Sequence, residues 1–141
     1  MTTDATLVVK EKKVTLDLNG KTLKNKKENT ATDVIVVAEG ATLTINGEGT
    51  IEAVTGNDGY AVISEGTVVI NGGTFKAGVD VDDAANAVVY ARKNGKVYVN
   101  GGNFPNEYNS RYVLNKKDAD KEKTVVEVKG GTYVGFNPAE S

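Results

Sequence analysis

Apolar residues recur along the chain in short alternating runs, each followed by a glycine-containing break. One stretch reads "TVVINGGTF", in which the apolar run ends at Asn71 and restarts at Phe75. Taken alone, two such runs around an Asn-Gly pair predict a tight antiparallel hairpin. The chain contains five copies of this stretch, and their marking glycines are separated by 27, 25, 29 and 29 residues: Gly20, Gly47, Gly72, Gly101 and Gly130. This period is too long for a hairpin meander and predicts a coiled solenoid.

Each repeat contains three predicted strands: a first apolar run, the run before the glycine and the run after it. The first runs are "TLVV" from residue 6, "VIVV" from 34, "AVIS" from 61, "AVVY" from 87 and "YVL" from 112. We predict a single all-β domain over residues 1–141, a parallel β-helix of about five coils with three short strands each. The coils span roughly residues 6–33, 34–60, 61–86, 87–110 and 111–136. A β-sandwich is the alternative fold, because short strands with frequent turns suit it too.

Equivalent positions of successive coils have similar chemistry, which parallel stacking explains. The middle strands alternate between apolar and mostly polar residues, so one face is expected in the core. After the glycine corner, one position forms a predicted core stack of Leu23, Ile51, Phe75, Phe104 and Tyr133. At the corner itself, the predicted ladder of stacked side-chain amides consists of Asn19, Asn46, Asn71 and Asn100. Lys129 interrupts this ladder in the last coil, and we interpret the asparagines as turn residues with a structural role.

The repeated unit apolar-x-apolar-Asn-Gly-Gly-Thr-aromatic resembles a known family over about residues 6–136. It looks like the right-handed parallel β-helix of the pectate-lyase-like superfamily. It is especially similar to the non-enzymatic "INGGTF"-type repeats of gut bacterial surface proteins and of their phages' appendages. This resemblance implies the fold more specifically than a function, because β-helices include lyases, hydrolases, adhesins and phage spikes.

Composition removes several classes of function. The 141 residues carry a formal net charge of -2, so no basic field favours nucleic acid. Cysteine and histidine are both absent, which excludes disulfides and any Ser-His or Cys-His catalytic pair. The N-terminal stretch contains only a three-residue apolar run, so we predict neither an export signal nor membrane insertion. No cofactor is expected.

An enzyme of the resembled superfamily needs acidic or basic groups on an exposed face. Pectate lyases use calcium held by acidic residues together with an arginine base, and the related polygalacturonases use aspartates with a histidine. The weak candidates for a calcium site are Asp80, Asp82 and Asp83, which fall in a predicted loop between coils. The chain has two arginines, Arg92 and Arg111, and we interpret both as surface charges. We therefore predict that the protein is not an enzyme.

Tyrosines provide candidate contacts for a glycan. Tyr98 is on the outer phase of its strand, and Tyr90 and Tyr112 lie on first strands, where they are candidates for stacking on a sugar ring. The alternative is that these rings pack along the flanks of the solenoid. A polysaccharide-binding or polysaccharide-lyase β-helix is accordingly retained as an alternative function.

The ends of the predicted solenoid point to assembly. A stack of five coils leaves a strand edge at each end, and neither "MTTDA" nor "NPAES" is long enough for a substantial cap. We expect a structural or attachment protein whose partners are other protein chains, either further copies or a host particle. A phage virion component, such as a head decoration, fibre or tail appendage, is the leading expectation. An excised repeat module of a bacterial surface adhesin is the alternative, and both place the chain on a virion or cell surface.

Overall fold

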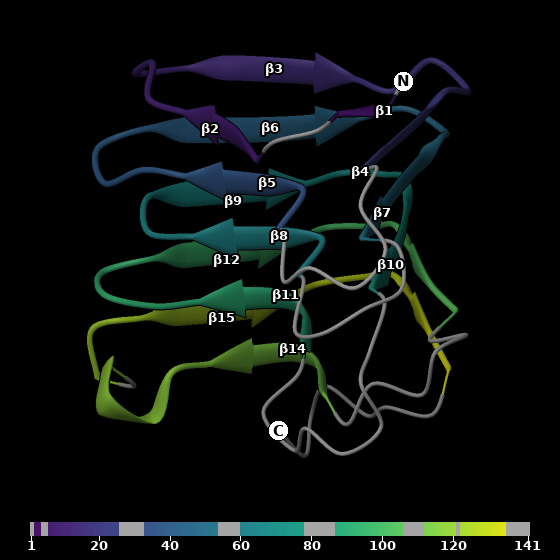
Figure 1. Ribbon diagram of the computed structural model, residues 1–141. Coiled ribbons are helices and arrows are strands. Elements are labelled where there is room, and N and C mark those ends of the chain that lie inside the picture. The colour runs from purple at the N-terminus through teal and green to yellow at the C-terminus, as the bar shows by residue number, and fades with distance from the viewer. Residues whose placement is uncertain are drawn as a thin grey trace.

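The chain folds into a parallel β-solenoid, as Figure 1 shows. In this computed structural model, residues 2–3, 6–25, 33–53, 60–77, 87–105, 112–120 and 122–134 are described. Every strand pairs in parallel with the strand three places before or after it in the sequence, so the chain passes through three sheets in turn. The predicted all-β parallel fold is therefore confirmed, and the β-sandwich alternative is wrong because its strands would pair mainly antiparallel.

The three sheets correspond to the three strands predicted in each repeat. Sheet 1 contains the first runs: β2 (Leu7–Val9), β5 (Ile35–Val37), β8 (Val62–Ser64), β11 (Ala87–Ala91) and β14 (Tyr112–Lys116). Sheet 2 contains the middle runs: β3 (Val14–Asp17), β6 (Thr42–Asn46), β9 (Thr67–Ile70), β12 (Lys96–Val99) and β15 (Val125–Val128). Sheet 3 follows the glycine corner: β1 (Thr2–Thr3), β4 (Thr22–Asn25), β7 (Thr50–Ala53), β10 (Thr74–Ala77), β13 (Asn103–Phe104) and β16 (Thr132–Tyr133). One short 3-10 helix, η1 (Asp118–Asp120), follows β14.

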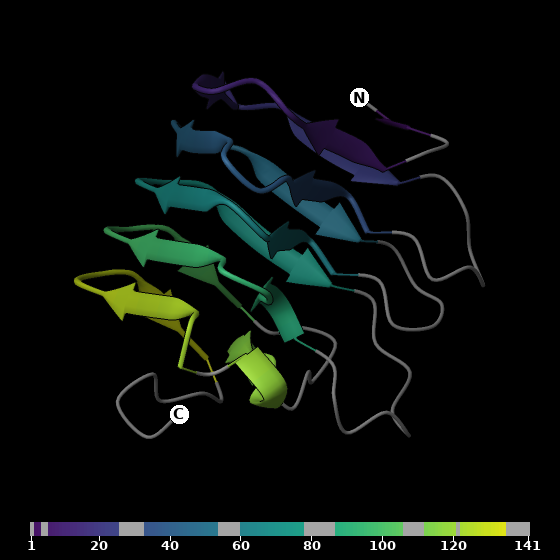
Figure 2. The same cartoon turned by 90° about the vertical axis from the view of Figure 1, so that its left-hand side faces the viewer.

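The solenoid encloses about three turns between two end layers. Residues 33–53, 60–77 and 87–105 each supply one strand to every sheet, and each of these strands has a neighbour on both sides. Residues 6–25 and 112–134 supply the two end layers, which Figure 2 shows at the two ends of the stack, and in sheet 3 β1 adds one more strand beyond β4. The sequence predicts about five coils, whereas the structure has about three enclosed turns. The two counts differ because the repeat count in the sequence also includes the first and last repeats, which form the end layers.

The core lies between the three sheets and consists of inward-facing apolar side chains. The alternation in sheet 2 is clear, because Leu43, Ile45, Val68 and Ile70 are buried while the residues between them are partly exposed. In sheet 3, the ring of Phe104 stacks on the rings of two neighbours, with centroid distances of 5.2 Å to Phe75 and 4.9 Å to Tyr133. The predicted core stack continues through Ile51 to Leu23 in the register of β10, β7 and β4.

The end layers are less buried than the enclosed turns. At the N-terminal end, the side chains of Leu7 and Val8 are 42% and 46% exposed. Thr2 and Thr3 of β1 pair with the outer edge of β4, which covers part of sheet 3 at this end. Within the described residues, β2 and β3 have no neighbour on that side. An uncovered strand edge of this kind is a template for pairing with another strand.

Candidate functional site

The corner between sheets 2 and 3 carries hydrogen-bonded asparagine side chains. Nδ2 of Asn71 donates to Oδ1 of Asn46 at 2.8 Å, and Nδ2 of Asn100 donates to Oδ1 of Asn71 at 2.9 Å. The register of β6, β9 and β12 places these three residues in one column. Both bonds run from the later coil to the earlier one. Each bond of the ladder therefore points from the C-terminal layer towards the N-terminal layer.

The first member of this column differs from the sequence prediction. Asn19 is predicted there, but Asp17 of β3 is the residue that pairs with Asn46. Asn19 instead has a φ of 47°, the next residue has a φ of 72°, and the N–H of Lys21 donates to the carbonyl of Leu18 at 2.8 Å. Two positive φ angles closed by such a bond form the turn that Asn-Gly favours. Asn19 is therefore excluded from the ladder, because it lies in a tight turn beyond the end of β3.

The column ends in opposite charges. Lys129 occupies it in the last layer, because its N–H donates to the carbonyl of Val99, just as the N–H of Asn100 donates to that of Ile70. Its Nζ atom lies 3.5 Å from Oε1 of Glu127, and both side chains are exposed. At the other end, the carboxylate of Asp17 is exposed and accepts a local backbone N–H at 3.1 Å.

The glycine pairs at the corner have two different physical roles. A Cβ atom added to Gly101 would lie 2.7 Å from the carbonyl oxygen of Asn71, so the close approach of two coils requires glycine there. Gly102 has a φ of 105°, a region that L-residues rarely adopt. Beside these corners lies a groove of about 590 Å³, lined by glycines of three coils together with Glu48, Asn71, Thr74 and Asn103. Its surface offers backbone, amide, hydroxyl and carboxylate groups to a hydroxylated ligand.

The candidate tyrosines lie on different faces. Tyr98 is on sheet 2, in register between Val69 and Glu127. Tyr90 is on sheet 1, and its ring stacks on that of Tyr60 with a centroid distance of 4.8 Å and an interplanar angle of 19°. The backbone of Tyr112 is in β14, and its side chain lies outside the described part of the structure. The structure therefore pairs Tyr90 with Tyr60 and does not bring Tyr90 and Tyr98 together.

A partly buried carboxylate lies beside the tyrosine pair, and sequence reasoning did not find it. Oδ1 of Asp33 accepts the N–H of Tyr60 at 3.0 Å. Burial raises the pKa of Asp33, and the hydrogen bond from Tyr60 and the charge of Arg92 offset only part of this effect. The available signal is positional, since Asp33 and Tyr60 each stand directly before a first run in successive coils.

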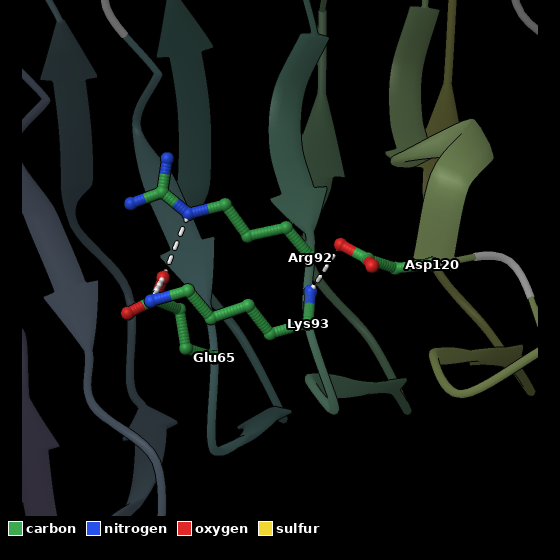
Figure 3. A network of polar contacts seen from close by, with 4 residues as sticks. All are labelled: Glu65, Arg92, Lys93 and Asp120. Carbon is green, nitrogen blue, oxygen red and sulfur yellow. Dashed lines mark hydrogen bonds and ion pairs between the residues drawn. The ribbon is translucent and has the colours of Figure 1, made fainter.

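Charged side chains connect three successive coils at the turn between sheets 1 and 2 (Figure 3). Nε of Arg92 and Nζ of Lys93 lie 2.8 Å and 2.9 Å from Oε2 of Glu65 in the preceding coil. The N–H of Lys93 donates to Oδ2 of Asp120 in the next coil at 2.7 Å. Burial raises the pKa of Glu65, but the hydrogen bonds and charges of Lys93 and Arg92 outweigh it and leave this pKa below its ordinary value.

This network assigns Arg92 a local partner, in keeping with its interpretation as a surface charge. Sequence reasoning missed the network itself, although Glu65 and Arg92 are 27 residues apart, which is one coil. Arg111, the other arginine considered as a lyase base, lies outside the described residues.

The predicted acidic candidates Asp80, Asp82 and Asp83 also lie outside the described residues. Across the described ranges, no three acidic side chains gather as a metal site would require. In the same ranges, no helix has the length and apolar character needed to cross a membrane. The chain matches no protein-family model, no curated protein and no solved structure.

Proposed function

We propose that this chain is a non-enzymatic structural or attachment module that assembles with other protein chains through the ends or flanks of its solenoid. The observation that carries the proposal is the burial along one column of sheet 1. In this column Leu7 is 42% exposed, whereas the exposed fraction is 2% or less in each of the next four layers: Ile35, Val62, Val89 and Leu114. A core position this exposed is one that solenoids normally cover, and covering it with another chain removes apolar surface from water.

The N-terminal edge of sheet 2 supports the same proposal. Val14 and Leu16 face the core from β3 but are only half-buried, while their partners in β6, Leu43 and Ile45, are almost completely buried. The strand edge of β3 also presents backbone N–H and C=O groups, which favour addition of a strand. Apolar surface and unpaired backbone groups therefore coincide at one end of the molecule.

The resemblance of the repeat supports a more specific context. We place the chain among the right-handed β-helices of the pectate-lyase-like superfamily, with the non-enzymatic "INGGTF"-type repeats. Within that group, a phage virion component such as a head decoration, fibre or tail appendage is the leading proposal. A repeat module of a bacterial surface adhesin is the alternative, and in both contexts the module is part of a larger assembly.

The proposal includes no catalytic role. It is supported by the absence of histidine and cysteine from the chain and by the ion pair that holds Arg92 against Glu65. A lyase assay on uronic-acid polysaccharides in added calcium tests this part. Cleavage abolished in a variant carrying both Asp82→Asn and Asp83→Asn would overturn it.

Localisation tests the structural role directly. An antibody against the purified chain is used to follow the protein through fractions of source cells and of any phage particles they release. We expect it to sediment with virions or with the cell envelope and to remain there after dilution. Recovery only as free protein would contradict an assembled role.

Polysaccharide binding is the second candidate, and the Tyr60–Tyr90 ring pair favours it. Paired aromatic rings beside a carboxylate provide a stacking surface with a hydrogen-bond acceptor, which suits a sugar ring. A glycan array with the wild type and Tyr90→Ala tests this candidate. Binding that Tyr90→Ala removes and Tyr98→Ala retains would support a site on sheet 1. Absence of binding in the wild type would reject it.

A further inference from the structure

We propose that the partner at the β3 edge is a second copy of this chain, docked head to tail so that β15 of one copy pairs in parallel with β3 of the next. This inference rests on the proposed function and names the partner. It is carried by the column that contains the asparagine ladder. In chain order, its members are Asp17, Asn46, Asn71, Asn100 and Lys129.

The two ends of this column carry groups of opposite charge. Asp17 stands at its N-terminal end and Lys129 at its C-terminal end, and both side chains are exposed. A carboxylate only accepts hydrogen bonds and an ammonium group only donates them. A second copy in the same orientation therefore extends the column and brings Lys129 of one copy to Asp17 of the next. This bond runs opposite to the bonds of the asparagine ladder, so it rests on charge complementarity between the two ends.

The apolar positions agree in the same register. The pairing of each sheet 2 strand with the next places Val126 in the column of Val14, and Val128 in the column of Leu16. All four side chains are half-buried and contact the core cluster from the two end layers. Stacking β15 on β3 buries them against each other in the way that the enclosed turns bury their equivalents.

The contact is assigned to sheet 2 because the other two sheets are less suited to it. In sheet 3, β1 already pairs with the outer edge of β4. In sheet 1, Leu114 of the last layer is 2% exposed, whereas Leu7 of the first layer is 42% exposed, so those two ends do not match. Among the strands that the structure describes, those at the two ends of sheet 2 both carry half-buried apolar side chains and place opposite charges in one column.

The arrangement predicts open, linear oligomers. A head-to-tail contact uses two different surfaces of the chain, so each added copy leaves the same two surfaces free at the ends. A contact between two like ends does not bring Asp17 to Lys129. The oligomers are therefore expected to grow with concentration and not to stop at a dimer.

Sedimentation velocity on the full chain tests the contact, from about 1 µM to about 1 mM at low salt. We expect the mean mass to rise with concentration. Asp17→Lys and Lys129→Glu each place like charges in the junction and should weaken association about tenfold. An equimolar mixture of the two variants should associate as the wild type does, because each variant then meets an oppositely charged partner. Lys117→Glu is the matched control, since it makes the same charge change at an exposed position in the same end layer.

The possible results are distinct. Restoration in the mixture together with an unaffected Lys117→Glu supports the contact. Association that is insensitive to Lys129→Glu, or single variants that are not restored by mixing, overturns it. A wild type that stays monomeric at about 1 mM also overturns it. If such a monomer still sediments with virions or envelopes, the proposed function stands and the partner at the β3 edge is a different protein. Circular dichroism of each variant verifies that the fold is intact.

Discussion

The central ring of the aromatic stack provides a direct test of how successive coils hold together. Phe104 is fully buried, and its ring lies against Phe75 on one side and Tyr133 on the other. Phe104→Leu keeps an apolar side chain at this position and removes both ring pairs at once. Phe75→Leu is the matched comparison, because Phe75 is also fully buried and has one aromatic neighbour, with Ile51 on its other side.

The expected magnitudes follow from the number of ring pairs. An aromatic pair contributes about 0.5–1.5 kcal/mol beyond the area it buries. Phe104→Leu should therefore lower the free energy of unfolding by about 1–3 kcal/mol from the lost pairs, with a further ~1 kcal/mol from imperfect packing of the new side chain. Phe75→Leu should lower it by about half as much from its single pair.

Equilibrium urea unfolding followed by circular dichroism measures these changes. The double variant completes a thermodynamic cycle, and the coupling free energy between Phe75 and Phe104 should be about 0.5–1.5 kcal/mol. Because a solenoid is stabilised by contacts between neighbours, Phe104→Leu should also lower the cooperativity of the transition. Equal losses for the two single variants, or a coupling free energy near zero, would refute the stacking explanation.

Four further variants test the corner and the charge network. Gly101→Ala should destabilise by about 1–3 kcal/mol, since its Cβ would overlap the carbonyl of a neighbouring coil. At Gly20 there is space for a Cβ atom, but the φ of 72° is strained for alanine, so Gly20→Ala should cost about 1–2 kcal/mol. Thermal unfolding of both glycine variants measures the loss from steric overlap at Gly101 and the loss from backbone strain at Gly20. Asn71→Ala removes two ladder bonds and should cost about 1–2 kcal/mol in urea unfolding, and a loss near zero would mean that the exposed amides do not stabilise the fold. The folded-state pKa of Glu65 lies below its ordinary 4.5, so its contribution is present above that pH and is lost as the pH falls through the folded-state pKa. Glu65→Gln should flatten the pH dependence of stability in that window, and an unchanged profile would count against the network.

The stacking order of the solenoid could be predicted from the sequence because it depends on repeated positions. Phe75, Phe104 and Tyr133 recur at one distance from their marking glycines, and parallel pairing makes such a recurrence a spatial column. The three-strand division of each repeat follows for the same reason, since each strand is a separate apolar run. Periodicity therefore identifies the sheets without any knowledge of the connections between them.

The first corner was predicted wrongly because the repeat period does not specify where extra residues are placed. Four residues separate Asp17 from Thr22, whereas two separate Asn71 from Thr74. Alignment on the Asn-Gly pair shifted the register of β3 by two residues and brought Asn19 into the ladder. In the structure the extra residues are taken up by a tight turn, and the side chain of Leu18 is buried beneath the corner.

The contacts between different turns were not predictable from a single repeat. The Glu65–Arg92 pair joins two charged residues that each look like solvent-exposed turn residues in their own coil. Burial of Asp33 depends on a neighbouring coil in the same way. Ile63 provides a third case, since its neighbours Val62 and Ser64 are also buried, so β8 is covered on both faces. Such positions depend on what lies across the sheet, which a pattern along one strand does not report.

Because its strands are stacked in three parallel sheets, the resistance of the molecule to force depends on the direction of pulling. The backbone hydrogen bonds between coils point along the axis of the stack, because such bonds lie roughly at right angles to the strands they join. Tension along that axis pulls on the bonds of one interface between coils, and the weakest interface yields first. Tension along the strands shears whole rows of bonds, so the load is shared among them. A solenoid of this kind resists force best when its anchor points lie on opposite flanks, and it peels coil by coil when it is pulled from its ends.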